Sequence, residues 1–163
     1  MGAIQTLEAA LTLRGRGCHE EALCALVKLA GEEPGDAQVQ AQAAFVHDFL
    51  GREEEAVPFY ERAIAQGLSP ELERECLLGL GSSYRNLGRY QEAWDILARG
   101  RERYPDAQEF VVFGAMAGYN LGRHHEAMAL LLGALADTSC DETIKAYRSA
   151  IRVYASDLDR IYA

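Results

Sequence analysis

The chain has 163 residues, of which 49% are hydrophobic and 25% are charged, an ordinary composition for a globular domain. Its 25 acidic residues outnumber its 16 basic residues, and the formal net charge of -9 disfavours contact with nucleic acid or anionic membranes. No apolar run approaches the roughly 20 residues that a membrane-spanning helix needs. The N-terminus also lacks the basic cluster of a secretory signal peptide. We therefore predict a cytoplasmic protein that binds neither nucleic acid nor membrane.

The four cysteines show no CxxC spacing, and we interpret them as free thiols rather than as disulfides or metal ligands. Cys18, His19 and Cys24 could share one helix face. One helix rarely completes a tetrahedral zinc site, however, so we predict no metal and no other cofactor.

The strongest signal is an internal repeat, the pattern Gly-x-x-x-Glu-Ala, which begins at Gly17, Gly51, Gly88 and Gly122. A small residue lies seven positions before each of these glycines. Glycine allows a tight left-handed turn at a helix end, and glutamate in the next turn favours the positive end of the following helix. Small residues at fixed positions let two antiparallel helices approach closely. The pattern therefore predicts repeated pairs of helices joined by short turns.

In chain order, the pattern predicts four helix-turn-helix repeats at about residues 3–35, 36–68, 70–105 and 106–138. The third repeat starts with Ser69 and Pro70, an N-cap followed by a first-turn proline, which predicts a longer first helix there. Asp106 and Ser139 each stand three residues before a glutamate, the spacing of a capping box. They are predicted to open the fourth repeat and the final helix.

A last amphipathic segment follows the fourth repeat. Ile144, Tyr147, Ile151 and Tyr154 recur at helical spacing and predict one helix over about residues 140–160. A repeat array needs a terminal element to cover its last hairpin, and this helix is the expected cap.

A period of about 34 residues of helix, turn and helix is typical of tetratricopeptide repeats. The whole chain resembles the tetratricopeptide repeat family, and the third repeat, LLGLGSSYRNLGRYQEAW, fits it best. More narrowly, this segment and FVHDFLGREEEAVPFYERAIAQGL resemble short bacterial tetratricopeptide proteins. The resemblance implies an all-α, right-handed superhelix of four helix-turn-helix repeats plus a C-terminal capping helix, forming one domain over residues 1–163. The first repeat departs from the pattern, because Cys18 and His19 follow its glycine where the family has arginine and an aromatic residue.

The resemblance also implies a function. In this family the first helix of each hairpin lines a concave groove where a protein or peptide partner lies. Carried over position by position, the groove residues are Leu11, Arg14, Gln38, Phe45, Asp48, Glu75, Ser82, Arg85, Asn86, Met116, Tyr119 and Asn120. Such a mixture of apolar and hydrogen-bonding side chains suits an extended or helical peptide. The alternatives are that the apolar members pack against neighbouring helices, or that the terminal helix folds back into the groove.

Other ligands and activities find less support. Some family members grip a chaperone's C-terminal carboxylate with a clamp of lysine, asparagine and arginine, but Leu7, Leu11, Gln42 and Leu78 occupy those positions here. No nucleophile elbow, HExxH motif or phosphate-binding loop occurs, so we predict no catalytic residues and no enzyme. The leading hypothesis is an adaptor or assembly module. The alternatives are a self-associating structural protein, such as a homodimer, or a secretion-type chaperone.

Overall fold

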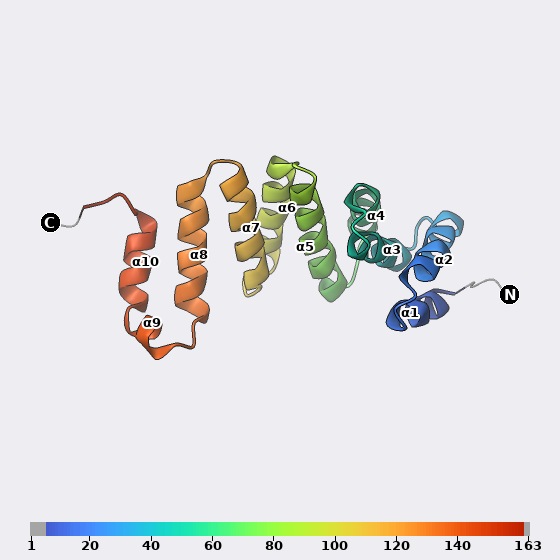
Figure 1. The fold of residues 1–163 in the computed structure, drawn as a ribbon, viewed down its shortest axis with the longest axis horizontal. Helices are drawn as coiled ribbons and strands as arrows, with labels where there is room; N and C mark the ends of the chain where they lie inside the picture. Colours follow the sequence, from blue (N-terminus) through green and yellow to red (C-terminus); the bar gives the residue numbers. More distant parts are fainter. Residues whose placement is uncertain (1–5, 162–163) are drawn as a thin grey trace. The chain divides into compact units, whose positions relative to one another are not determined.

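The structure is a computed structural model that describes residues 6–161, and in this range it contains ten helices and no strand (Figure 1). Eight helices form the four predicted hairpins. They are α1 (Leu7–Gly15) and α2 (His19–Glu32), α3 (Ala37–Phe49) and α4 (Glu53–Gln66), α5 (Pro70–Asn86) and α6 (Tyr90–Arg103), and α7 (Gln108–Asn120) and α8 (His124–Thr138). Two shorter helices follow, α9 (Glu142–Ala146) and α10 (Arg148–Ser156). The predicted start of the first repeat, near residue 3, lies outside the described residues.

The turns between paired helices have the predicted left-handed glycine. The φ angles of Gly17, Gly51, Gly88 and Gly122 are 81°, 69°, 75° and 76°. After α3, the N–H of Gly51 donates to the carbonyl of Asp48 at 2.9 Å, and the N–H of Arg52 donates to the carbonyl of His47 at 2.9 Å. This pair of bonds is a Schellman motif, which satisfies carbonyls that the ending helix leaves free. It recurs after α1, α5 and α7.

The small residues of the repeat are predicted to lie where paired helices cross. The alanines of the pattern are all buried: Ala22, Ala56, Ala93 and Ala127. The small residues seven positions before each glycine are buried too: Ala10, Ala44, Gly81 and Ala115. Both sets are therefore buried, as the sequence predicts.

The helices form two compact units, Met1–Arg89 and Tyr90–Ala163, and each is described here by itself. Unit 1 contains α1 to α5, and unit 2 contains α6 to α10. The boundary falls in the turn of the third hairpin, so the compact units do not follow the sequence repeats. The single-domain organisation therefore stays a prediction.

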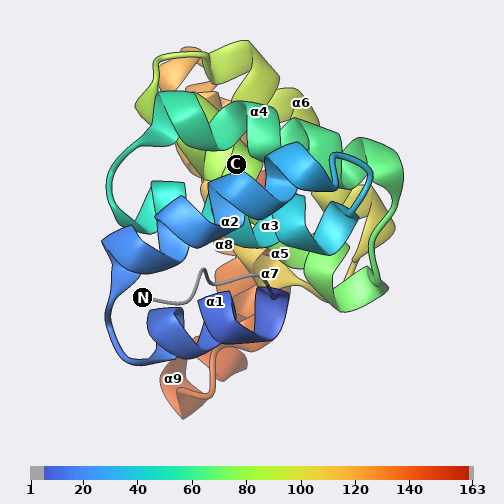
Figure 2. The same cartoon turned by 90° about the vertical axis from the view of Figure 1, so that its right-hand side faces the viewer.

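Unit 1 is built around α2, α3 and α4. Figure 2 views it from its N-terminal end and shows α2 beside α1 and α3. Leu23 and Leu26 of α2 pack with Ala43 and Val46 of α3 in one buried cluster. Tyr60 of α4 is 1% exposed. This core fixes α3 between its neighbours and so positions the α3 side chains that face away from it.

Unit 2 packs α7 against both α6 and α8. The ring of Phe110 in α7 is completely buried and lies against Gly100 of α6. On the other side, α8 lies between α7 and α10 (Figure 1). The C-terminal segment thus covers α8, as predicted for a cap.

Two of the predicted helix starts differ in the structure. Ala107, and not Asp106, is the N-cap of α7, and no side chain caps that helix. The final segment is capped by Asp141, which accepts bonds from the N–H groups of Thr143 and Ile144, and not by Ser139. Asp141 takes the extended backbone conformation at its helix start, whereas Ala107 does not.

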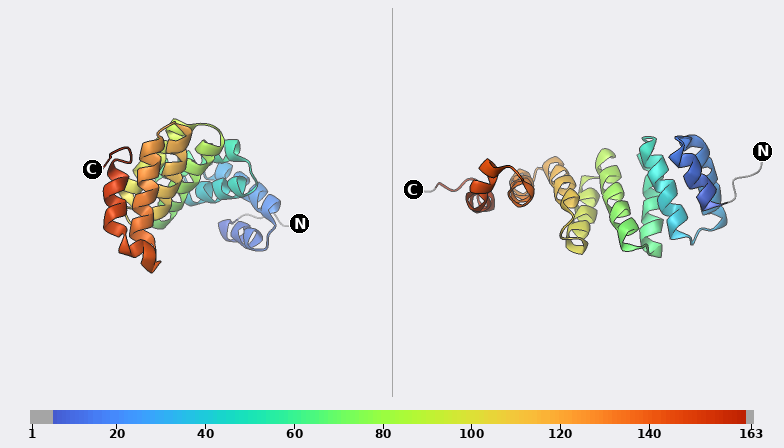
Figure 3. Two further views of the ribbon diagram at one scale, coloured as in Figure 1. Left: turned by 60° about the vertical axis from the view of Figure 1, so that its left-hand side comes forward. Right: turned by 90° about the horizontal axis from the view of Figure 1, so that it is seen from below.

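The predicted helix over residues 140–160 is also interrupted, because α9 ends at Ala146 and α10 begins at Arg148. Figure 3 shows this C-terminal segment in red. The N–H of Tyr147 donates to the carbonyl of Ile144, three residues back, as in a 3-10 turn. No glycine or proline marks this break. The next residue, Arg148, donates from Nε to the carbonyl of Ala136 in α8 at 2.7 Å, which anchors α10 to α8.

Candidate functional site

The predicted site residues lie on the first helices of the hairpins, nine of them in unit 1 and three in unit 2. In unit 1, Arg14 of α1 reaches across to α3. Its Nη1 donates to Oε1 of Gln42 at 2.5 Å, and its guanidinium carbon lies 5.6 Å from the ring centre of Phe45. Gln42 and Phe45 are three residues apart and therefore share one side of α3. The ring of Phe45 in turn meets Tyr60 edge-on, with ring centres 5.7 Å apart.

One turn further along α3, Asp48 joins α3 to α4 and α5. The Tyr60 hydroxyl donates to its Oδ2 at 3.1 Å, and the Ser83 hydroxyl donates to its Oδ1 at 3.2 Å. Burial raises the pKa of Asp48 above its ordinary value, because a half-buried carboxylate loses hydration. The two hydroxyl donors act in the opposite direction by stabilising the charged form. Burial and the nearby Asp48 also raise the pKa of Tyr60.

Tyr60 reaches Asp48 because α5 leaves room for it. A Cβ at Gly79 would overlap the Tyr60 hydroxyl and lie 2.6 Å from its Cζ. Gly79 thus allows a second-helix side chain to place its polar end on the first-helix side of unit 1. Arg14, Phe45 and Asp48 are therefore linked into one network over α1, α3 and α5.

The other predicted residues of unit 1 are not part of this network. Asn86 donates from Nδ2 to Oε1 of Glu53 at 3.2 Å, on the neighbouring helix α4. Gln38 and Glu75 are exposed. The remaining three are half-buried: Leu11, Ser82 and Arg85. The predicted site residues of unit 1 thus include both polar groups held by hydrogen bonds and side chains that are exposed to solvent.

Three residues of the predicted site lie in unit 2, all on α7. Met116 is 40% exposed and Tyr119 is 65% exposed. The Tyr119 ring lies against His124, with ring centres 4.9 Å apart. Asn120 is half-buried. We call the nine predicted residues of unit 1 the first-helix face, whereas the three residues on α7 belong to unit 2.

Sequence reasoning missed Tyr60 and Ser83, which hold Asp48 in place. Tyr60 belongs to a second helix, and family analogy assigns only first-helix residues to the site. Ser83 is the residue after the predicted Ser82, and it is completely buried while Ser82 is not. Gly79 could have indicated Tyr60 from the sequence, because a glycine in the middle of a helix often marks the close approach of a neighbouring side chain.

The described part of the chain offers little for other kinds of site. Across residues 6–161, no three His, Cys, Asp or Glu side chains are grouped so that they could hold a metal ion. Cys24 is exposed while Cys18 is half-buried. Among the helices of the same range, none combines the length and apolarity needed to cross a membrane.

Two solved structures are similar to this chain. The first is YrrB, described as a TPR protein with an unusual peptide-binding site, with a TM-score of 0.74 and 21% identity over 98% of this chain and 79% of that one. The second is MamA protein, with a TM-score of 0.74 and 16% identity over 90% and 82% of the two chains. The comparison with curated proteins returned no match.

At these identities the likeness shows the fold alone, the all-α tetratricopeptide architecture. A family model described as "Tetratrico peptide repeat" matches residues 37–158, which begins at the second hairpin and leaves out the first, divergent repeat. This match covers most of the sequence and agrees with the four glycine turns and buried alanines. The chain therefore belongs to the tetratricopeptide repeat family.

Proposed function

We propose that this chain is a non-enzymatic adaptor or assembly module that holds a protein or peptide segment on the first-helix face. The family is in general one of protein-interaction repeats rather than of enzymes. The observation that supports the proposal best is the network of Arg14, Phe45 and Asp48. It holds a cation of α1 and an aromatic ring and a carboxylate of α3 in fixed positions, and Ser83 of α5 bonds to that carboxylate.

Such a network favours binding because its polar groups are ordered before a partner arrives. The protein therefore loses less conformational entropy when a partner binds than it would if these groups were mobile. Gln38 and Glu75 are exposed beside it and can pair with backbone or side-chain groups of a peptide. Met116 and Tyr119 supply exposed apolar surface on the corresponding helix of unit 2.

A matched pair of variants tests this assignment. Glu75→Lys with Met116→Glu changes two exposed residues on first helices, whereas Glu54→Lys with Val27→Glu makes the same kinds of change on second helices. The immobilised wild type and both variants are exposed to native lysate, and retained proteins are identified by mass spectrometry. We expect specific partners to be lost from the first-helix variant and kept by the second-helix variant. Equal retention by all three proteins would rule out the first-helix face.

A second candidate function is self-association, which the exposed apolar residues near the C-terminus favour. Met128, Leu131 and Leu135 are all exposed and lie three to four residues apart, on one side of α8. Tyr147 and Tyr154, in the segment that covers α8, are exposed as well. Rows of exposed apolar side chains of this kind commonly mark protein interfaces.

Light scattering distinguishes this candidate from the first. Self-association predicts a dimer at about tens of micromolar, a range in which weak interfaces are occupied. Met128→Glu should convert that dimer to a monomer, whereas Met116→Glu should not. A monomeric wild type at the same concentration would leave partner binding as the only function proposed.

A further inference from the structure

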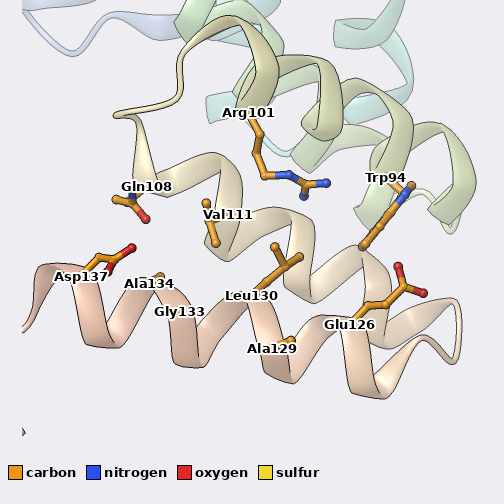
Figure 4. Close-up of a pocket in the computed structure, with 10 residues that line it drawn as sticks. All are labelled: Trp94, Arg101, Gln108, Val111, Glu126, Ala129, Leu130, Gly133, Ala134 and Asp137. Atoms are coloured by element: carbon orange, nitrogen blue, oxygen red, sulfur yellow. The ribbon is translucent and has the colours of Figure 1, made fainter. Parts of the chain in front are cut away.

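A pocket of about 530 Å³ lies within unit 2, between α6 and α8, with α7 forming part of its wall (Figure 4). Its apolar lining includes Trp94, Val111 and Leu130, and its cation is Arg101. The volume falls within the range of roughly 300–1,000 Å³ that is usual for sites of small organic molecules. None of the residues of the first-helix face lines this pocket.

Two glycines of α7 let large side chains of α6 lie flat at the edge of this pocket. A Cβ at Gly114 would overlap Nη1 of Arg101, and a Cβ at Gly118 would lie 2.6 Å from Cζ3 of Trp94. The Arg101 guanidinium carbon is 5.1 Å from the ring centre of Trp94. The cation and the indole ring are therefore neighbours, packed between two helix backbones.

One nitrogen of the Arg101 guanidinium has no hydrogen-bond partner within the described residues. This atom, Nη1, is buried. The nearby Glu102 carboxylate favours the charged form of Arg101 electrostatically, but it does not hydrogen-bond to Nη1. Burial lowers the pKa of Arg101, although a guanidinium keeps its proton in proteins. A buried guanidinium nitrogen without a hydrogen-bond partner is costly, so most proteins pair such groups.

The two acids that line the pocket already have other partners. Glu126 lies 3.9 Å from Nη1 of Arg123, and Asp137 accepts a bond from Nε of Arg152 at 3.1 Å. Arg123 also lies over the Trp94 ring, 4.8 Å from its centre. The pocket thus combines an apolar lining, one guanidinium with a nitrogen that lacks a hydrogen-bond partner, and two carboxylates that would repel a ligand with several negative charges.

We infer that this pocket binds a small organic acid, with one carboxylate placed beside Arg101 and an apolar body against Trp94, Val111 and Leu130. A neutral ligand would make no charge-assisted bond to the guanidinium, and a cation would be repelled by it. A dianion or a phosphate ester would be repelled by the carboxylates of Glu126 and Asp137. The same carboxylate could be presented by an acidic side chain of a polypeptide, but the volume of the pocket favours a free small molecule.

Trp94 is the only tryptophan of the chain, so intrinsic fluorescence reports directly on this pocket. We would titrate the full chain with 3-phenylpropionate and with its neutral isostere, 3-phenylpropanamide. The acid should give a saturable change with a Kd of about 1 mM, the range expected for a ligand of this size. The amide should bind roughly 10-fold or more weakly, because it lacks the charge-assisted bond.

Two results of these titrations would overturn the inference. One is equal binding of the acid and the amide, and the other is no saturable change with either probe up to about 10 mM. A third probe separates the two sources of carboxylate, a blocked tetrapeptide with one central glutamate beside leucine. If it binds more tightly than 3-phenylpropionate, the assignment to a free small acid is wrong.

Glycine variants provide the structural control. A Cβ at Gly133 of α8, which lines the pocket, meets no atom within 4 Å, so Gly133→Leu fits the helix while its side chain fills the pocket. Gly31→Leu makes the same change in α2, where a Cβ also meets nothing within 4 Å and no pocket residue is near in sequence. We expect Gly133→Leu to abolish binding of the acid and Gly31→Leu to leave it unchanged. Equal binding by both variants would contradict the assignment.

Arg101→Met tests the charge, because methionine keeps much of the length of the side chain and removes the cation. The Arg101→Met variant should bind 3-phenylpropionate and 3-phenylpropanamide with equal strength, because it has lost the cation behind the roughly 10-fold preference of the wild type for the acid. Circular dichroism establishes that each variant is folded, and Gly133→Leu decides the question if Arg101→Met is not. A retained preference for the acid in folded Arg101→Met would overturn the role of Arg101.

Discussion

Gly100 of α6 provides a quantitative test of the packing in unit 2. A Cβ at this position would overlap Cδ1 and Cε1 of Phe110 and lie 2.8 Å from its Cγ. The Phe110 ring is completely buried, and its other neighbour is Tyr104, with ring centres 6.1 Å apart. The ring therefore has no free space into which it could move if Gly100 were replaced by alanine.

Two opposing effects set the size of the change in Gly100→Ala. Alanine stabilises a helix interior by about 0.5–1 kcal/mol relative to glycine. Overpacking of a filled core costs about 1–3 kcal/mol. The free energy of unfolding should therefore fall by roughly 1 kcal/mol, within a range of about 0–2.5 kcal/mol, against the usual direction of a glycine-to-alanine change in a helix.

Gly133→Ala in α8 is the matched control, because a Cβ there meets no atom within 4 Å. It should raise the free energy of unfolding by about 0.5–1 kcal/mol. Urea unfolding followed by far-UV circular dichroism measures both changes as shifts of the midpoint at constant slope. If both variants raise the midpoint by the same amount, the reasoning about Phe110 is refuted.

Two further predictions concern titratable groups. Burial raises the pKa of Asp48 in the folded chain above its ordinary value of 3.8. The folded state therefore holds this proton more tightly than the unfolded state does, and protonated Asp48 adds to the free energy of unfolding. That added stability is lost as pH rises through 3.8 towards the folded pKa. The stability of wild type relative to Asp48→Asn should accordingly decline over that range in urea titrations, and a difference that grows with pH would contradict it. Burial raises the pKa of Cys76 to about 12, and this thiol is 0% exposed. At about pH 8, Ellman's reagent should therefore label exposed Cys24 and Cys140 quickly and Cys76 only in denaturant, and equal rates would show that α5 opens readily.

The repeat itself was predictable because each of its residues acts locally. A left-handed turn after α3 needs glycine whatever surrounds it, and Gly51 therefore marks the turn from the sequence alone. Ser69 and Pro70 likewise form a local start signal, and α5 begins at Pro70 with the Ser69 hydroxyl accepting from the N–H of Leu72. The family model for residues 37–158 agrees with this local pattern.

Contacts between helices were less accessible to sequence reasoning. Asp48 was assigned to the first-helix face, but its partner Ser83 is 35 positions away, and its other partner, Tyr60, comes from a second helix. The pocket around Arg101 carries no sequence motif, since it depends on Gly114 and on the pairing of nearby acids with other arginines. The break at Tyr147 was missed because the helical spacing of apolar residues continues across it.

That interrupted C-terminal segment has a dynamic consequence. Neither α9 nor α10 contains a buried residue, and α10 follows a helix of only five residues. Few buried contacts thus oppose local opening there, whereas the hairpins before it each enclose several buried side chains. In hydrogen–deuterium exchange we expect the amides of α10 to exchange well before those of α7. Each such opening would briefly uncover the side of α8 that α10 occupies, which makes the end of the array its least protected surface.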